Sequence, residues 1–162
     1  MDVLAVDSDR LFMKCALQEA QMALRAGEVP VGAVIVDSNG QIVAAARNEK
    51  ETLRDPTAHA ELTAIRIAAV TSASGWRLHG MTLYVTKEPC VMCAGAIVNS
   101  RLSRVVYGCA DVKGGAAGSI FSLCDDERLN HRADVTRGVL EVECAGLLRE
   151  FFADLRRGCR AV

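Results

Sequence analysis

The stretch TKEPCVMC, residues 86–93, places a proline directly before two cysteines that stand three positions apart. Strand-forming residues precede it and an apolar run follows, which indicates a junction between a strand and a helix. Proline suits the first turn of a helix because the N–H that it lacks has no partner there. We therefore expect Pro89 in the first turn of a helix over residues 90–100, with Cys90 and Cys93 on one face. The helix N-terminus favours their thiolate forms, so the pair can hold a metal ion.

A second junction, DPTAHAE at residues 55–61, supplies residues that complete such a site. His59 and Glu61 are two positions apart and so point about 200° from each other on a helix. They cannot both hold one metal ion from the side of that helix. A histidine at the helix tip, however, can reach an ion beyond the end of the helix, and Glu61 then faces the open position of that ion.

These residues favour a catalytic zinc site over two alternatives. One histidine and two cysteines make three protein ligands, which leaves the fourth position of Zn²⁺ for water. A structural zinc site needs a fourth ligand, and no other cysteine or histidine pair has the spacing of a second knuckle. A thioredoxin-like redox pair leaves the H-A-E motif unexplained. H-x-E together with P-C-x-x-C resembles the signature of the zinc nucleobase deaminases, in which the glutamate is a general acid and base rather than a ligand.

The composition is typical of a globular protein with one core. The chain has 162 residues, 51% of them hydrophobic and 24% charged, and we expect residues 1–162 to form a single zinc-dependent deaminase domain. Seven cysteines without regular spacing indicate reduced thiols. The apolar runs are too short to cross a bilayer and the first residues lack a secretory signal pattern, so we expect a cytoplasmic protein without a membrane partner. A net charge of −1 does not by itself indicate a nucleic-acid binder.

Alternating helix and strand signals predict a mixed α/β fold. The expected helices cover residues 8–26, 59–70, 90–100 and, more briefly, 119–124. The expected strands cover residues 31–37, 41–48, 81–86 and 104–108, the first two joined by an Asn-Gly turn. Residues 138–143 are either a fifth strand or the start of a last helix that runs to about Arg157. This order predicts a partly parallel, five-stranded sheet covered by helices on both faces.

Several segments beyond the two motifs resemble one family in their order along the chain. They are RVVYG, DVKGGAAGS, LNHR and LLREFFADLRR, and with the two motifs they are similar to the bacterial tRNA-specific adenosine deaminases from about residue 9 to residue 157. The resemblance implies a three-layer α/β/α sandwich of the cytidine-deaminase-like type, a homodimer and one Zn²⁺ per subunit. It also implies conversion of adenosine to inosine at the wobble position, with the tRNA anticodon arm bound near the dimer interface.

The resemblance assigns roles to individual residues. It implies that His59, Cys90 and Cys93 are the zinc ligands and that Glu61 is the general acid and base. Asn48 matches an asparagine that binds the extruded nucleoside, and Asp111 matches an aspartate at the RNA channel. The remaining expected substrate-binding residues are Ala60, Pro89 and Lys113. The expected RNA-binding residues are Arg101, Arg104, His131, Arg132, Arg156 and Arg157.

Other functions stay open on the sequence alone. A deaminase of free cytosine, cytidine or guanine would share the metal site, and a zinc-stapled interaction module would need no turnover. The segments DVKGGAAGS and LNHR favour a tRNA substrate over the first, and Glu61 favours an enzyme over the second. Lys87 departs from the family, which usually carries an apolar residue there. Either its stem packs while its amine reaches solvent, or the rim of the pocket is altered.

Overall fold

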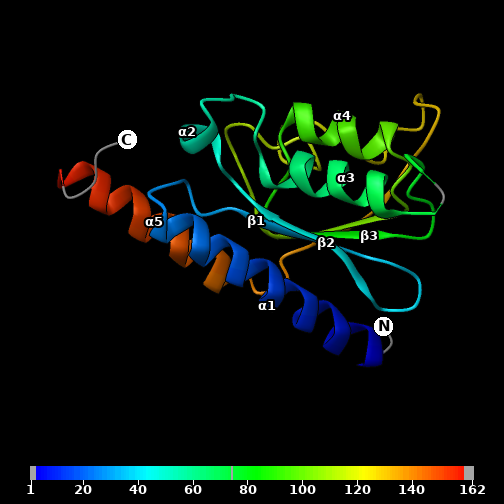
Figure 1. Ribbon diagram of the computed structural model, residues 1–162, viewed down its shortest axis with the longest axis horizontal. Helices are drawn as coiled ribbons and strands as arrows, with labels where there is room; N and C mark the ends of the chain where they lie inside the picture. Colours follow the sequence, from blue (N-terminus) through cyan, green and yellow to red (C-terminus); the bar gives the residue numbers. More distant parts are fainter. Residues whose placement is uncertain (1–2, 74, 159–162) are drawn as a thin grey trace.

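A mixed five-stranded sheet forms the centre of the computed structural model, which describes residues 3–73 and 75–158 (Figure 1). The strand order is β2-β1-β3-β4-β5. β1 pairs antiparallel with β2 and with β3, whereas the β3–β4 and β4–β5 pairs are parallel. The strands are β1 (Gly32–Val36), β2 (Ile42–Arg47), β3 (Thr82–Lys87), β4 (Arg104–Cys109) and β5 (Asp134–Arg137).

Helices cover both faces of this sheet, which confirms the expected three-layer architecture. Figure 1 shows α3 and α4 on one face and α1 and α5 on the other. None of the helices in the described part of the chain combines the length and apolarity needed to cross a membrane. The helices are α1 (Val3–Arg25), α2 (Lys50–Leu53), α3 (Ala60–Thr71), α4 (Val91–Asn99) and α5 (Glu141–Arg156).

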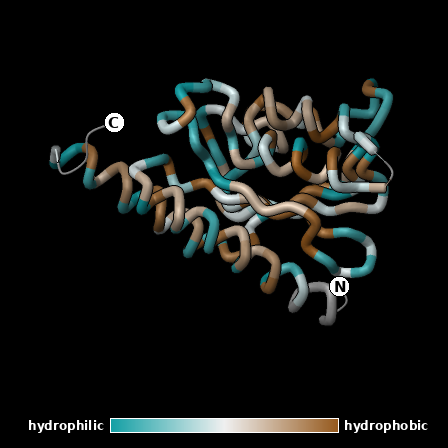
Figure 2. The backbone as a smooth tube through the Cα atoms, in the orientation of Figure 1, coloured by the Kyte–Doolittle hydropathy of each residue, from teal (hydrophilic) through white to brown (hydrophobic). Residues whose placement is uncertain are grey.

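The central strand β1 explains why two layers of helices are needed. All five of its residues are buried, and Figure 2 shows hydrophobic residues concentrated in the middle of the molecule. Ala33 and Ile35 pack in the core under α3 and α4, while Val34 and Val36 pack in the core under α1 and α5. Successive residues of a strand point to opposite faces, so this strand has no face for solvent. A Cβ atom at Gly32 would lie 2.1 Å from the backbone oxygen of Ala16, so only glycine lets α1 approach this closely.

Two expectations about local structure are wrong, and one pair of alternatives is decided. Residues 119–124 form turns and a bridge rather than a helix. For residues 138–143 the start of the last helix is confirmed, since β5 ends at Arg137 and α5 begins at Glu141. Positive φ angles at Gly138 and Leu140 separate β5 from α5. Pro89 lies one residue outside its helix, since Cys90 is the N-cap of α4.

Asp9 of α1 ties that helix to β3 and β4. Its carboxylate accepts two hydrogen bonds from the guanidinium of Arg104, at 2.8 and 2.7 Å, and one from the Tyr84 hydroxyl at 2.9 Å. Arg104 also donates to the Thr136 hydroxyl of β5. Burial raises the pKa of Tyr84, so its hydroxyl remains a donor to Asp9. Arg104, an expected RNA-binding residue, therefore has its charge balanced inside the protein.

We predict that Asp9→Ala lowers the free energy of unfolding by roughly 2 kcal/mol, because Arg104 and Tyr84 both lose their acceptor. Urea titration measures the change. The matched control is Asp126→Ala, which removes an ion pair with the exposed Arg128 and should change stability far less. Equal effects of the two substitutions would contradict the proposed anchoring role of Asp9.

Candidate metal centre

The N-termini of α3 and α4 bring three metal-binding side chains together. His59 is the N-cap of α3 and Cys90 is the N-cap of α4, with Cys93 in the first turn. His59 Nδ1 lies 3.7 Å from Cys90 Sγ and 3.5 Å from Cys93 Sγ, and all three donor atoms lie within 4.8 Å of one another. The expected position of the histidine at a helix tip is thus confirmed.

The donor spacing fits zinc. Typical Zn–N and Zn–S bonds at a tetrahedral angle place nitrogen and sulfur about 3.5 Å apart. Both measured separations are close to this value, and the third pair of donors stays within the same cluster. Among the residues that the structure describes, no other group of three such side chains comes together in this way. The three side chains therefore suit one Zn²⁺ with a fourth position left for water.

The two cysteines already provide one thiolate at neutral pH. Their mutual hydrogen bond lowers the pKa of the Cys90 thiol to about 3 and raises the pKa of Cys93, with burial adding to the second effect. The hydrogen bond between His59 and the Cys90 thiolate also raises the pKa of His59. The negative charge of a thiolate next to two further metal-ligand atoms favours the binding of a cation at this site.

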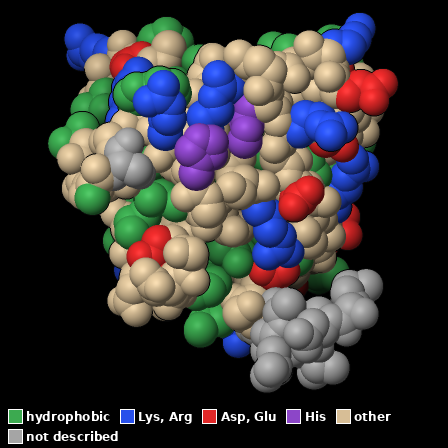
Figure 3. Space-filling model, turned by 90° about the vertical axis from the view of Figure 1, so that its right-hand side faces the viewer, with side chains coloured by type: hydrophobic (Ala, Val, Ile, Leu, Met, Phe, Trp, Pro, Cys, Tyr) green, Lys and Arg blue, Asp and Glu red, His purple; other side chains and the backbone are tan. Residues whose placement is uncertain are grey.

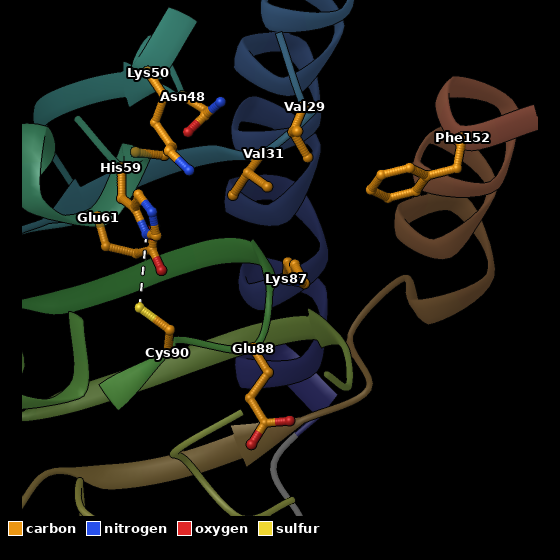
Figure 4. A pocket seen from close by; sticks show the side chains of 11 residues that line it. Val29, Val31, Asn48, Lys50, His59, Glu61, Lys87, Glu88, Cys90 and Phe152 are labelled. Atoms are coloured by element: carbon orange, nitrogen blue, oxygen red, sulfur yellow. Dashed lines mark hydrogen bonds between the residues drawn. The ribbon is translucent and has the colours of Figure 1, made fainter. Parts of the chain in front are cut away.

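Glu61 is buried beside these donors without being one of the three. It is 4% exposed, and Figure 4 shows its carboxylate next to the His59 ring. Burial raises the pKa of Glu61, which disfavours a permanently ionised carboxylate. A carboxyl group of this kind, next to a position for activated water, can both accept and return a proton.

A cavity of about 230 Å³ opens onto the metal donors (Figure 4). Val29, Val31 and Phe152 give it apolar walls. Its remaining lining residues are Asn48, Lys50, His59, Ala60, Glu61, Lys87, Glu88 and Cys90. Asn48 and Ala60 were expected to contact substrate and do line the cavity, whereas Pro89, Asp111 and Lys113 are not among its lining residues.

Glu88, which the sequence did not single out, organises the loop beside the cavity. Its carboxylate is 2% exposed and accepts hydrogen bonds from the N–H groups of Asp111, Ala117 and Ser119 at 2.9, 3.1 and 2.9 Å, and from the Ser119 hydroxyl. Burial alone would raise the pKa of Glu88, but these hydrogen bonds outweigh burial and leave the pKa lowered. A Cβ atom at Gly115 would lie 2.3 Å from this carboxyl group, so the loop requires glycine there.

Lys87 connects the same loop to the rim of the cavity. Its ammonium group lies 2.6 Å from a carboxylate oxygen of Asp111, whose other oxygen accepts hydrogen bonds from the N–H groups of Lys113 and Gly114. The lysine side chain lines the cavity and is 33% exposed. The rim of the cavity thus carries a charge at Lys87, while the partial exposure of the side chain also fits an amine that reaches solvent.

The expected RNA-binding residues lie at two ends of the sheet, and their role remains a prediction. Arg156 and Arg157 end α5 one turn after Phe152 of the cavity. Arg101 donates to Asn130 and His131 contacts the Leu102 carbonyl, near the opposite end of β4 from the cavity. Figure 3 shows histidine side chains among basic side chains on one face of the molecule. Arg132 is exposed in the same segment.

Comparisons with known proteins agree with this geometry. Residues 6–109 match the model of the cytidine and deoxycytidylate deaminase zinc-binding region. The tRNA-specific adenosine deaminase of Bacillus subtilis is 51% identical over 94% of both chains. The enzyme of the same name from Haemophilus influenzae is 47% identical over 96% of this chain and 91% of its own. The chain belongs to the tRNA-specific adenosine deaminase family.

Solved structures place this member of the family in the same fold. A structure from work on A-to-I editing by tRNA:A34 deaminases at the wobble position is 44% identical, with a TM-score of 0.80 over 85% of this chain and 98% of its own. A guanine deaminase from Bacillus subtilis is 39% identical, with a TM-score of 0.57 over 68% of this chain and 66% of its own. The fold is thus shared more widely than among the tRNA:A34 deaminases.

We predict that the purified protein holds one Zn²⁺ per chain and that Cys90→Ala lowers this content at least tenfold, because two donors cannot complete the site. Metal analysis of both proteins after dialysis measures the zinc content per chain. Cys15→Ala, which removes a thiol of α1 outside the cluster, should keep the zinc. A folded and active wild-type protein without metal would contradict the assignment.

Proposed function

We propose that this protein hydrolyses adenosine to inosine at the wobble position of a tRNA anticodon and releases ammonia. The observation that carries the proposal is the position of Glu61 beside the three metal donors, at the wall of a cavity that can take one base. The 51% identical tRNA-specific adenosine deaminase supports the choice of substrate.

Each residue at the wall of the cavity has a separate task in this reaction. His59, Cys90 and Cys93 would hold the zinc, which when bound would lower the pKa of a water molecule at its fourth position. Glu61 takes one proton from the attacking water and delivers it to N1 of adenine. It then takes the remaining proton from the oxygen bonded to C6 and passes it to the amino group, which leaves as ammonia. Backbone N–H groups at the N-termini of α3 and α4 favour the negative charge carried by the attacking oxygen.

The cavity favours a single extruded base. Its volume of about 230 Å³ is small, and Phe152 is its one aromatic residue. Aromatic residues make up only 4% of the chain, too few for a platform on which several bases stack. The wobble nucleotide would leave the stack of the anticodon loop and enter alone, as in other base-flipping enzymes.

We further propose a cytoplasmic homodimer whose 162 residues form one domain. Exposed apolar side chains on the segment after β4 support a protein interface, since large apolar patches seldom face solvent in a monomer. These side chains are Val112, Ile120, Phe121 and Leu129. The family resemblance supports an anticodon arm bound near that interface.

A substrate panel tests the proposed function. We expect inosine to form in an anticodon stem-loop RNA with a wobble adenosine, and far less product from free adenosine, cytidine or guanine. Chromatography of nuclease-digested RNA measures inosine directly. Equal turnover of free adenosine and the RNA, or turnover of guanine alone, would contradict the proposal.

We predict that Glu61→Gln keeps its zinc and fold yet lowers turnover roughly 10²-fold or more, because the amide cannot move protons. The measurements are inosine formation, zinc content and thermal unfolding on one preparation. Loss of zinc from this variant would instead identify Glu61 as a ligand.

We predict that RNA binding weakens with added salt and that the double variant Arg156→Ala/Arg157→Ala flattens this dependence. Each lost phosphate contact lowers the slope of log affinity against log salt by about 0.7 to 0.9. Binding of the stem-loop is measured at several salt concentrations. The double variant Arg10→Ala/Lys14→Ala makes the same change in charge on exposed positions of α1 and should keep the slope. Equal slopes for both double variants would contradict a role for the end of α5.

A further inference from the structure

Glu28 is a buried carboxylate that neither binds the metal nor lines the cavity. It is 1% exposed and lies between α1 and β1. One of its oxygens accepts a hydrogen bond from Asn48 Nδ2 at 2.9 Å, and the other accepts one from the N–H of Thr52 at 2.7 Å. A buried carboxylate is costly unless hydrogen bonds compensate it, so its position next to the substrate cavity needs a reason.

Part of that reason is structural. Thr52 is in α2, whose N-cap residue Glu49 makes no side-chain hydrogen bond to the helix. The N–H of Thr52 is the third in α2. An N-cap side chain normally accepts a hydrogen bond from the second or third N–H of its helix. Glu28 therefore caps α2 from a distance and also steadies Lys50, which lines the cavity.

The second hydrogen bond fixes the amide of Asn48. A flipped amide would set Oδ1 against the Glu28 carboxylate, where two acceptors face each other without a proton, so Nδ2 must point to Glu28. Figure 4 accordingly shows the Asn48 oxygen on the side of His59 and the nitrogen turned away. Oδ1 accepts no hydrogen bond from the described residues, and no buried side-chain oxygen among them is left without a partner, so Oδ1 is accessible. Glu28 thus makes Asn48 a fixed acceptor at the cavity wall.

The chemistry of the substrate identifies the donor. Within an RNA chain the 3′ and 5′ oxygens of adenosine are esterified, so its N–H and O–H donors are the N6 amino group and the 2′-hydroxyl. The amino group is the leaving group and faces the metal donors and Glu61. The group left for Asn48 Oδ1 is the 2′-hydroxyl, which distinguishes RNA from DNA.

We propose that Glu28 is a positioning residue that fixes Asn48 Oδ1 as the acceptor for the 2′-hydroxyl of the extruded adenosine. The pair then selects a ribonucleotide at the target position. This inference rests on the proposed function, because it needs an adenosine within an RNA chain.

Two substitutions separate this role from helix capping. Glu28→Gln keeps the shape but offers one acceptor, which the N–H of Thr52 takes, and turns an amide donor toward Asn48. The Asn48 amide then rotates so that Oδ1 accepts from Gln and Nδ2 faces the cavity. Adding Asn48→Asp restores the pattern, because one carboxylate oxygen accepts from Gln and the other faces the cavity as Oδ1 did.

The experiment compares two anticodon stem-loop RNAs that carry adenosine or 2′-fluoro-2′-deoxyadenosine at the wobble position only, since fluorine can accept a weak hydrogen bond but cannot donate one. The readout is the ratio of their kcat/KM values, which does not depend on the fraction of folded enzyme. We expect a ratio of about ten for the wild type, since one hydrogen bond is lost. The ratio should fall toward one in Glu28→Gln, because Nδ2 then faces the cavity and the hydroxyl and the fluorine can both accept from it. It should return toward the wild-type value in the Glu28→Gln/Asn48→Asp variant, whose carboxylate oxygen again needs a donor. Glu19→Gln, which alters a carboxylate bonded to Arg47, is the matched control and should keep the ratio.

The outcomes are distinguishable. A wild-type ratio near one with full activity on the adenosine RNA overturns this inference and leaves the proposed function intact. An unchanged ratio in Glu28→Gln, or no recovery in the double variant, shows that Glu28 only caps α2. No inosine from either RNA overturns the proposed function itself.

Discussion

The metal centre depends on β1 being antiparallel to both of its neighbours. That pairing makes β2 and β3 run in the same direction, so the chain leaves both strands at the same edge of the sheet. α3 and α4 begin beyond that edge. As a result, Nδ1 of the N-cap residue His59 lies 3.7 Å from Sγ of the N-cap residue Cys90. The N–H of Gly32 also donates to the Thr86 hydroxyl at this edge, which fixes β1 against the end of β3. Every later feature of the site is placed relative to these two helix ends.

Three buried glutamates lie at or next to the cavity, and their surroundings give them different tasks. Glu88 accepts hydrogen bonds that leave its pKa lowered and hold the loop after β4. Glu28 accepts one hydrogen bond from the side-chain amide of Asn48 and one from the backbone N–H of Thr52, and so holds Asn48 and α2 in place. Burial raises the pKa of Glu61, so its proton is the mobile one. Glu88 and Glu28 thus have structural roles, and Glu61 is the one of the three that takes part in the reaction.

The sequence was informative where chemistry is local and uninformative where contacts are distant. Short motifs predicted His59, Cys90 and Glu61 because ligand spacing and helix position are set within a few residues. The helix expected at residues 119–124 is absent because that segment bonds to Glu88, far away in the chain. Arg104 looked like a free cation because its partner Asp9 is 95 residues away. Phe152 and Glu28 gain their roles only when α5 and the end of α1 pack beside the cavity, which no short pattern reveals.

X-ray absorption at the zinc edge tests most directly whether the two helix ends form a three-ligand site with one open position. For the purified protein we predict two sulfur ligands at about 2.3 Å and two light-atom ligands, one nitrogen and one oxygen, at about 2.0 to 2.1 Å. A fragment of the substrate that fills the cavity should alter the oxygen shell and leave the sulfur shell unchanged. A spectrum with three or four sulfur ligands, or with no exchangeable light atom, would contradict an open catalytic centre at His59, Cys90 and Cys93.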